Sequence, residues 1–350
     1  MTKLKVGISV GDLNGVGMEI IFKTFRNKAM SDMCTPIVFG NAKAAGFYRK
    51  ATKSNEFSFN IVNSISEISV DKANLVAISN EEISLSPGTP SKQTGAFAAQ
   101  SLKAATEALS KGEIDVLVTA PIDKNTIQSA DFNFPGHTEY LTHYAGEKES
   151  LMFMVSENIR VATLSNHVAL KDVVKEITQD KIKAKLDILI KSLQDDFGIV
   201  KPKVAVLGLN PHAGDNGQIG EEEKDVIIPA LKAYNQNDAL VMGPYSADGF
   251  FGNGSYKQFD AVLSMYHDQG LVPFKILSFG SGVNFTAGLP VVRTSPDHGV
   301  AYDIAGKNTV DENSFRQAIY TAMDVFKMRK KLKEWRENPL EHHELKVDRK

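Results

Sequence analysis

Short apolar runs alternate with longer amphipathic stretches along most of this chain. The short runs are rich in β-branched residues, which is typical of buried strands, and we predict strands at residues 5–10, 36–40, 75–78, 115–119, 151–155, 161–164, 203–209 and 261–265. In the longer stretches apolar residues recur every three or four positions, and we predict helices at residues 94–111, 180–196, 221–234 and 312–335. Alternating strands and helices predict an α/β fold with a largely parallel sheet covered on both faces.

The length of the chain bears on the number of cores that it forms. A single hydrophobic core rarely grows beyond about 250–300 residues, and this chain has 350. We therefore expect two domains, or two lobes that share one sheet. Hydrophobic residues make up 42% of the chain and charged residues 23%, as in ordinary globular proteins.

Charge and cysteine content narrow the class of protein. The 40 basic and 42 acidic residues leave a net charge of −2, which is untypical of a protein that coats nucleic acid. No apolar stretch approaches the roughly 20 residues that cross a bilayer. Cys34 is the only cysteine, and the first residues carry no apolar signal region. We expect a cytoplasmic enzyme that binds neither nucleic acid nor a membrane, with a solvated tail from residue 334 that includes His342 and His343.

A glycine-rich segment follows the first predicted strand. Residues 11–19 read GDLNGVGME, and this spacing departs from the Gly-x-Gly-x-x-Gly pattern of dinucleotide-binding loops. Glycines here either let the backbone approach a ligand or form a tight turn into a helix, with Asp12 or Asn14 as the helix cap. Both interpretations remain open from the sequence.

Three histidines lie at or just beyond the ends of predicted strands. His167, His212 and His267 each follow an apolar, β-branched run. In an α/β sheet, ligands bind outside the carboxyl ends of the strands. Three neutral imidazoles there can hold a divalent metal and leave coordination positions free for a substrate. A lone histidine is more often structural, but three in the same context favour a metal site.

Acidic residues near these histidines are candidates for proton transfer and for orienting the rings. Asp268 and Gln269 follow His267 directly, and Asp248 lies in a Ser-Ala-Asp-Gly segment. A carboxylate that binds the second ring nitrogen fixes the orientation of a metal-bound histidine. We predict Asp248 or Asp268 as the proton acceptor.

Two further groups of polar residues are typical of an anionic substrate. His137 and Thr138 follow a rigid Pro-Gly turn and present an imidazole and a hydroxyl, although a helix that starts with Thr138 as its N-cap is the alternative. Lys275, Asn284 and Arg293 offer a point charge, an amide and a planar fork, which suit a phosphate monoester. Arg293 directly follows an apolar run, which is unusual for ordinary surface charge.

Five segments of the chain resemble the 4-hydroxythreonine-4-phosphate dehydrogenase family of vitamin B6 synthesis. The match runs in order from about residue 4 to about residue 330, through residues 11–19, 135–139, 210–223, 266–275 and 284–307. The loop at residues 298–307 also resembles the cofactor loop of the isocitrate and isopropylmalate dehydrogenases, and the glycine-punctuated stretch at residues 297–307 can wrap an adenosine moiety. The resemblance implies two α/β/α lobes with mostly parallel sheets and an active-site cleft between them. Residues 1–130 with 285–350 form the first lobe in this interpretation, and residues 131–284 the second.

The resemblance also implies a reaction and its residues. One divalent metal (zinc, magnesium or cobalt) is held by His167, His212 and His267, in a site completed across the two subunits of a homodimer. NAD or NADP oxidises the hydroxyl of 4-phosphooxy-L-threonine, and the product loses carbon dioxide to give 3-amino-2-oxopropyl phosphate. The residues implied to contact the substrate are His137, Thr138, Lys275, Asn284 and Arg293. Those implied to contact the cofactor are His298, Gly299, Ala301, Asp303 and Lys307.

The chain departs from the family pattern at a few positions and leaves two other functions open. Leu13 and Met18 stand where prolines are common, Gly249 where threonine is common and Asp215 where glutamate is common, but none of these changes removes an implied metal ligand. A paralogous dehydrogenase of a four-carbon sugar-acid phosphate, such as D-threonate 4-phosphate, would use the same metal and phosphate contacts. A non-catalytic metal- or phosphate-binding module is a more remote alternative, because the set of polar residues is complete.

Overall fold

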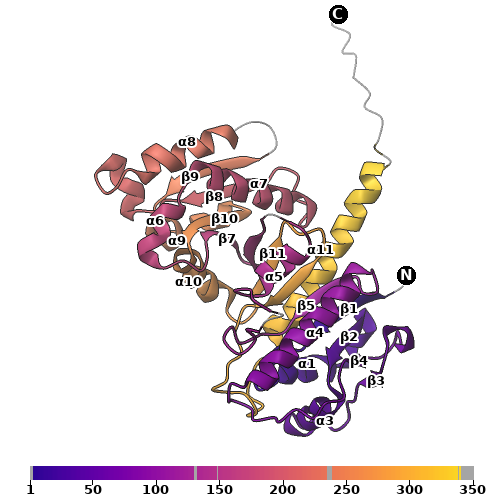
Figure 1. Cartoon of the computed structure of the whole chain (residues 1–350). Helices are drawn as coiled ribbons and strands as arrows, with labels where there is room; N and C mark the ends of the chain where they lie inside the picture. Colours follow the sequence, from indigo (N-terminus) through magenta and orange to yellow (C-terminus); the bar gives the residue numbers. More distant parts are fainter. Residues whose placement is uncertain (1–2, 130–131, 148, 235–238, 338, 340–350) are drawn as a thin grey trace, which may run out of the picture.

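One twelve-stranded sheet runs through the computed structural model, which describes residues 3–129, 132–147, 149–234, 239–337 and 339 (Figure 1). Its strands are β1 (Leu4–Ser9), β2 (Cys34–Gly40), β3 (Asn60–Val62), β4 (Asn74–Ala77), β5 (Val116–Thr119), β6 (Leu151–Val155), β7 (Arg160–Ser165), β8 (Lys203–Leu207), β9 (Leu240–Tyr245), β10 (Ala261–Tyr266), β11 (Val283–Ala287) and β12 (Arg293–Pro296). All eight predicted strands are present, with ends within two residues of the prediction. The strands β3, β9, β11 and β12 were not predicted.

The helices cover this sheet on both faces. They are α1 (Gly17–Phe25), α2 (Lys28–Met33), α3 (Ala42–Ala51), α4 (Lys92–Ser110), α5 (His137–Tyr144), α6 (Val173–Glu176), α7 (Gln179–Asp195), α8 (Ile228–Leu231), α9 (Ala247–Gly252), α10 (His267–Ser278) and α11 (Asn313–Glu337). Three predicted helices correspond to α4, α7 and α11. The fourth, at residues 221–234, is confirmed as a helical segment from residue 222 to residue 234, but its hydrogen bonding changes along it, from a π-helical turn η4 (Glu223–Ile227) to α8 and then to a 3₁₀ turn η5 (Lys232–Tyr234). Pro229 lies at its centre and has no N–H to donate to the preceding turn.

Neighbouring strands are parallel in all but three pairs. The strand order is β3-β4-β2-β1-β5-β12-β11-β6-β7-β10-β8-β9, and only the pairs β12–β11, β11–β6 and β6–β7 are antiparallel. The predicted α/β fold with a mostly parallel sheet is therefore confirmed. The sheet is continuous through both predicted lobes, and Figure 1 shows β1–β5 at one end, β7–β10 at the other, and β11 between them. The residue ranges assigned to the two lobes stay a prediction.

Alternation along the strands explains why both faces carry helices. In β2, Val38 packs into one hydrophobic cluster, whereas Ile37 and Phe39 pack into another on the opposite face. The first cluster includes Phe315 of α11, and the second includes Leu102 of α4. Strands buried on both faces are apolar throughout, which is why their apolar runs were visible in the sequence.

Two further expectations concern a membrane-spanning helix and the C-terminal tail. In the described ranges, no helix combines the length and the apolar character that a membrane span requires. The helix α11 extends to Glu337, so the predicted tail begins as helix. His342 and His343 lie outside the described residues.

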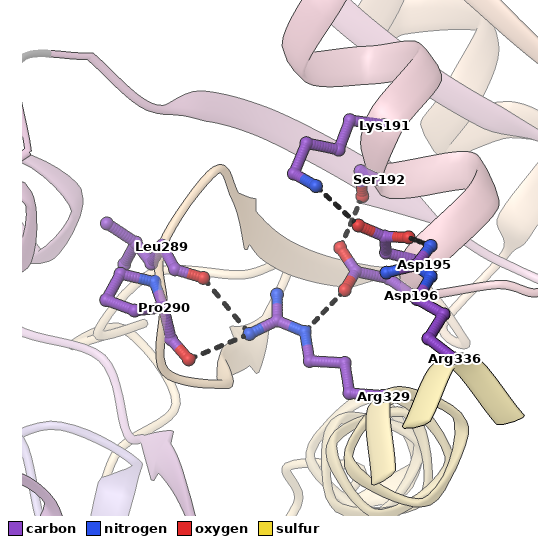
Figure 2. A network of polar contacts seen from close by, with 8 residues as sticks. All are labelled: Lys191, Ser192, Asp195, Asp196, Leu289, Pro290, Arg329 and Arg336. Carbon is purple, nitrogen blue, oxygen red and sulfur yellow. Dashed lines mark hydrogen bonds and ion pairs between the residues drawn. The ribbon is translucent and has the colours of Figure 1, made fainter. Parts of the chain in front are cut away.

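A network of charged residues joins α7 to α11 (Figure 2). Arg329 of α11 donates from Nε to Asp196 Oδ1 at 2.5 Å and from Nη1 to the carbonyl oxygens of Leu289 and Pro290 at 3.0 and 3.2 Å. Asp196 is only 4% exposed and also accepts from the Ser192 hydroxyl at 2.6 Å. Among the ion pairs of the described residues, the guanidinium of Arg329 is therefore the only cation that binds the buried carboxylate of Asp196.

Replacing Arg329 with leucine is expected to lower the free energy of unfolding by about 3 kcal/mol, because Asp196 would remain buried without a cation. Urea unfolding followed by circular dichroism measures the change. Arg336→Leu is the matched control, since Arg336 pairs with Asp195 at the surface, where an ion pair contributes about 1 kcal/mol or less. Equal losses in the two variants would contradict this account of Asp196.

Candidate active site

A cavity of about 290 Å³ lies beside the loops that follow β5, β7, β10 and β12. Its lining comes from residues on both sides of the predicted lobe division. Nine of the residues predicted from the sequence line it: His137, Thr138, His167, His267, Lys275, Asn284, Arg293, His298 and Gly299. The structure therefore brings together every predicted substrate contact, two of the three predicted metal ligands and the start of the predicted cofactor loop.

His137 and Thr138 form the first turn of α5 at one side of the cavity. The helix begins at His137 and its N-cap is Gly136, so the alternative in which Thr138 caps the helix is wrong. Burial lowers the pKa of the His137 imidazole well below its usual range, and the nearby cations Arg293 and Lys124 lower it further. The ring is therefore neutral at physiological pH and offers one donor and one acceptor nitrogen.

Three buried polar atoms in the cavity lining have no hydrogen-bond partner among the described residues. They are Nε2 of His137, Oδ1 of Asn284 and Nε2 of His298. Buried polar atoms in folded proteins are nearly always hydrogen-bonded, so an orphaned atom requires an explanation such as a bound ligand or ion. Three of them around one cavity point to a polar ligand.

Arg293 supplies a buried positive charge at the same cavity. The residue is only 2% exposed, and its guanidinium donates to the hydroxyl oxygens of Thr119 at 2.7 and 3.2 Å and of Thr286 at 3.1 Å. Among the described ion pairs no carboxylate binds it. Burial lowers the pKa of Arg293 to about 9, while Glu139 opposes this shift, so the group is still cationic at neutral pH. A desolvated guanidinium without a carboxylate is a site for an anionic ligand.

His167 and His267 lie close to each other in the cavity lining. Their ring centroids are 6.1 Å apart. Nζ of Lys124 lies 3.2 Å from Nε2 of His167, and an ammonium has no lone pair, so the imidazole nitrogen accepts. Burial lowers the pKa of His167, and Lys124 lowers it further, whereas Glu139, 4.0 Å away, raises it. His167 is therefore neutral, with a lone pair already directed at a cation, which is the state that a metal requires.

His212 does not join the other two histidines. It lines a separate hollow with Asn210, Ser246, Asp248 and Gln269. Within the described residues of a single chain, no group of three histidine, cysteine or acidic residues is close enough to hold a metal. The donor set of three imidazoles fits a divalent cation chemically, but the three-histidine site stays a prediction.

The two predicted proton acceptors differ in their surroundings. Oδ1 of Asp268 accepts from Nδ1 of His267 at 2.8 Å, which leaves Nε2 of that ring free to bind a ligand. Asp248 is exposed, and its pKa is lowered by hydrogen bonds from the Ser246 hydroxyl and the Gly249 backbone and by the nearby His212. Asp248 lies in the hollow of His212 and Asp268 beside His267, and the choice between the two proton acceptors stays a prediction.

The glycine segment at residues 11–19 serves as a structural support. Asp12 is fully buried and accepts from the backbone N–H of Asn14 at 2.8 Å and from the Tyr302 hydroxyl at 3.0 Å. Glu19 is also buried and accepts from the backbone N–H groups of Gly306 and Asn308. Neither Asp12 nor Asn14 caps α1, whose N-cap is Val16. Asp12 and Glu19 of this segment bind the loop at residues 297–308. This favours the interpretation that residues 11–19 form a tight turn into a helix, although neither Asp12 nor Asn14 is the helix cap.

The predicted cofactor residues follow this supported loop from the cavity toward the surface. His298 and Gly299 line the cavity, and Ala301 adopts a left-handed φ of 45°. Farther along, Asp303 and Lys307 are exposed, with Nζ of Lys307 donating to the Asp303 carbonyl at 2.6 Å. A dinucleotide fits this arrangement chemically, because the orphaned Nε2 of His298 and an exposed lysine lie along one loop.

Sequence reasoning missed three charged residues of the cavity lining: Asp297, at the start of the predicted cofactor loop, and the pair Lys124 and Glu139. Lys124 follows the predicted strand at residues 115–119 by five positions, and the strand-end pattern that identified the histidines could have identified it. Glu139 lies in the segment that was singled out for His137 and Thr138. Both now appear as neighbours of His167.

Comparison with known proteins identifies one family and relatives with two different names. The family described as pyridoxal phosphate biosynthetic protein PdxA matches residues 32–322. A 4-hydroxythreonine-4-phosphate dehydrogenase of Bacteroides thetaiotaomicron is 49% identical over 339 residues, which cover 97% of this chain and 93% of the relative. A relative in Oceanobacillus iheyensis, named "Putative D-threonate 4-phosphate dehydrogenase", is 36% identical over 91% of this chain and 97% of its own length.

A solved structure extends the similarity to three dimensions. The crystal structure of a 4-hydroxythreonine-4-phosphate dehydrogenase from Klebsiella pneumoniae matches with a TM-score of 0.77 at 33% identity. The match covers 93% of this chain and 98% of that one. The similarity therefore spans almost the whole of both chains.

Proposed function

Because the chain belongs to the PdxA family of pyridoxal phosphate biosynthetic proteins and is an oxidoreductase, we propose that it oxidises 4-phosphooxy-L-threonine with NAD or NADP. The hydroxyl becomes a ketone as the cofactor is reduced, and loss of the carboxylate as carbon dioxide gives 3-amino-2-oxopropyl phosphate. The observation that carries the proposal is Arg293, a buried cation without a carboxylate partner, in a cavity with three orphaned polar atoms.

The phosphate of the substrate binds on the side of Arg293. Its guanidinium keeps N–H groups beyond those donated to Thr119 and Thr286, and a planar fork matches phosphate oxygens in a bidentate manner. Lys275 adds a second positive charge from α10. Neutral His137 and the hydroxyl of Thr138 bind and orient the polar groups of the substrate carbon chain.

The proposed metal ligands are His167, His212 and His267. A divalent metal, such as zinc, magnesium or cobalt, would lower the pKa of the substrate hydroxyl and stabilise the negative charge that develops on oxygen. Asp268 orients His267 through Nδ1 and is the proposed proton acceptor. Without a metal, the ammonium of Lys124 donates a hydrogen bond to Nε2 of His167. With the metal bound, the same ammonium would balance negative charge on the substrate.

The loop at residues 297–307 is the proposed cofactor site. A nicotinamide cofactor would accept the hydride from the substrate carbon. His298 and Gly299 lie at the cavity, while Ala301, Asp303 and Lys307 continue along the loop. Asp12 and Glu19 fix the position of this loop, because both carboxylates accept hydrogen bonds from it.

We also propose that the enzyme is a cytoplasmic homodimer whose subunits meet beside the active site. Apolar side chains are exposed in the two segments that follow His167 and His267. They are Val168, Leu170 and Val174 after β7, and Val272, Ile276 and Phe279 on or at the end of α10. Val168 and Leu170 line one hollow together with His267, the first residue of α10, so the two segments begin side by side at the surface. Clustered apolar side chains beside a site that lacks its third ligand favour a second copy of the chain as the partner.

Ile276→Asp is expected to convert the dimer into monomers, because a carboxylate at a side chain that is 70% exposed in the single chain would be buried at the interface. Sedimentation velocity measures the change. Ile61→Asp is the matched control, since Ile61 is 54% exposed on β3 at the far end of the sheet. A dimer that persists in Ile276→Asp places the interface elsewhere.

Reduction of NAD or NADP with 4-phosphooxy-L-threonine tests the function. We expect cofactor reduction together with 3-amino-2-oxopropyl phosphate, lost on treatment with a chelator and restored by a divalent metal. Activity with D-threonate 4-phosphate alone would assign the chain to the paralogous reaction named for the Oceanobacillus iheyensis relative. The absence of reduction with either substrate in any of the metals would favour a binding module.

A further inference from the structure

The proposed metal ligand His212 lies in an unusual stretch of backbone. Five consecutive residues are left-handed, with φ angles of 54° at His212, 51° at Ala213, 80° at Gly214, 41° at Asp215 and 56° at Asn216. Only glycine adopts this region without strain, because a Cβ approaches the following carbonyl oxygen. Such strain persists only where the surroundings hold it, and it occurs most often at functional sites.

The carboxylate of Glu223 holds the start of this turn. Its Oε1 accepts from the backbone N–H of Asn210 at 2.7 Å, and its Oε2 accepts from the side-chain Nδ2 of Asn210 at 2.9 Å. Glu223 is only 3% exposed. Among the ion pairs of the described residues none involves Glu223, so these donated N–H groups are what stabilise the buried charge. Asn210 stands two residues before His212.

The glycines nearby indicate that the carboxylate packs against the turn itself. A Cβ on Gly214 would come within 2.6 Å of Glu223 Oε2. A Cβ on Gly208 would come within 3.1 Å of Glu223 Oε1 and within 2.9 Å of the Ala213 Cα. The carboxylate therefore lies against the backbone on both sides of His212.

The same region is linked to a second proposed ligand. Gln269 lies two residues after His267, and its Nε2 donates to the carbonyl of Gly208 at 2.7 Å. Its Oε1 accepts from the backbone N–H of Met265 at 2.7 Å. The backbone that leads to His212 is thus tied to the turn that carries His267, so the Glu223 contact also influences how the two imidazoles are placed relative to one another.

We propose that Glu223 is a positioning residue for His212: its buried carboxylate holds the left-handed turn in the arrangement from which the imidazole binds a divalent cation. Glu223 does not touch the cation. The inference rests on the proposed function, because it requires His212 to be a metal ligand. Groups that orient metal ligands typically change metal affinity by a factor of about 10 to 100.

Glu223→Gln tests the proposal with little change of shape. An amide has one acceptor oxygen, so either the backbone N–H or the side-chain Nδ2 of Asn210 would face an NH₂ group. In calorimetric titration of the dimer with Co²⁺ we expect a Kd about 10 to 100 times higher than in the parent protein. The visible absorption of bound Co²⁺ is expected to change as well, because it reports the ligand geometry. Glu221→Gln removes the same charge from an exposed neighbour and is expected to leave both readouts unchanged.

A double variant separates positioning from a general structural role. In the His212→Ala background, Glu223→Gln is expected to produce no further loss of Co²⁺ affinity, because the residue that it positions is gone. An equal loss in both backgrounds, or parent-like binding by Glu223→Gln, overturns the proposal while leaving the metal site intact. Parent-like binding by His212→Ala overturns the metal assignment and this inference with it. Should Glu223→Gln fail to fold, Asn210→Ala removes the side-chain half of the contact together with the hydrogen bond from Nδ2 to Glu222 Oε2 at 2.7 Å. Glu222→Ala is then the control for that second bond, and the same outcomes apply.

Discussion

His267→Ala is expected to lower kcat by about 10³-fold, because metal-assisted stabilisation of charge on the substrate oxygen contributes several kcal/mol and each 1.36 kcal/mol is about tenfold in rate. His267 lines the cavity, and its Nδ1 is bound to Asp268, so Nε2 is the nitrogen directed at a ligand. Steady-state rates at saturating 4-phosphooxy-L-threonine and cofactor, measured with and without added metal, give the effect on kcat.

His143→Ala is the matched control for this loss. His143 is an exposed histidine of α5 that contacts Phe134 and does not line the cavity. Its removal is expected to leave kcat close to that of the parent enzyme. If His267→Ala turned over substrate as fast as the parent enzyme with metal, even after treatment with a chelator, this imidazole would take no part in metal-dependent catalysis.

The sheet could be predicted from the sequence to the extent that its strands are buried on both faces. Strands such as β5 and β6 are nearly continuous apolar runs, and both were found. Two of the missed strands, β11 and β12, interrupt this pattern, whereas the short β3 and the apolar β9 were missed at the two edges of the sheet. β12 begins with Arg293 and reads RTSP, and β11 contains Asn284 and Thr286. These two strands are polar because they line the cavity, so the chemistry of the site obscured their conformation.

The candidate site was predictable in its members and not in its geometry. Strand ends, a Pro-Gly turn, a set of anion-binding side chains and the family resemblance together identified nine residues that line one cavity. Sequence spacing carries no information on how far apart distant loops lie, and His212 lies in a hollow apart from His167 and His267. The left-handed turn that sets the position of His212 depends on Glu223 and on glycines. No periodic pattern reveals a contact of that kind.

Arg293→Met is expected to raise KM for the phosphorylated substrate by about 10²-fold or more with a smaller change in kcat. Hydrogen bonds to a charged group contribute about 1.5–3 kcal/mol each, and a bidentate contact to phosphate would lose two of them. The free energy of unfolding is expected to fall by no more than about 1 kcal/mol, or to rise, because the guanidinium is buried without a carboxylate and its removal relieves an uncompensated charge.

Steady-state kinetics and urea unfolding of the same preparation give both quantities. Arg293→Lys retains the charge and loses the planar fork, so its KM is expected to lie between those of the parent enzyme and Arg293→Met. Arg160→Met serves as the control, since Arg160 is a partly buried arginine that packs over Phe197 away from the cavity, and its loss is expected to leave KM unchanged. An Arg293→Met enzyme that unfolds far more easily yet binds substrate normally would make Arg293 a structural residue and would remove the main support for the phosphate site.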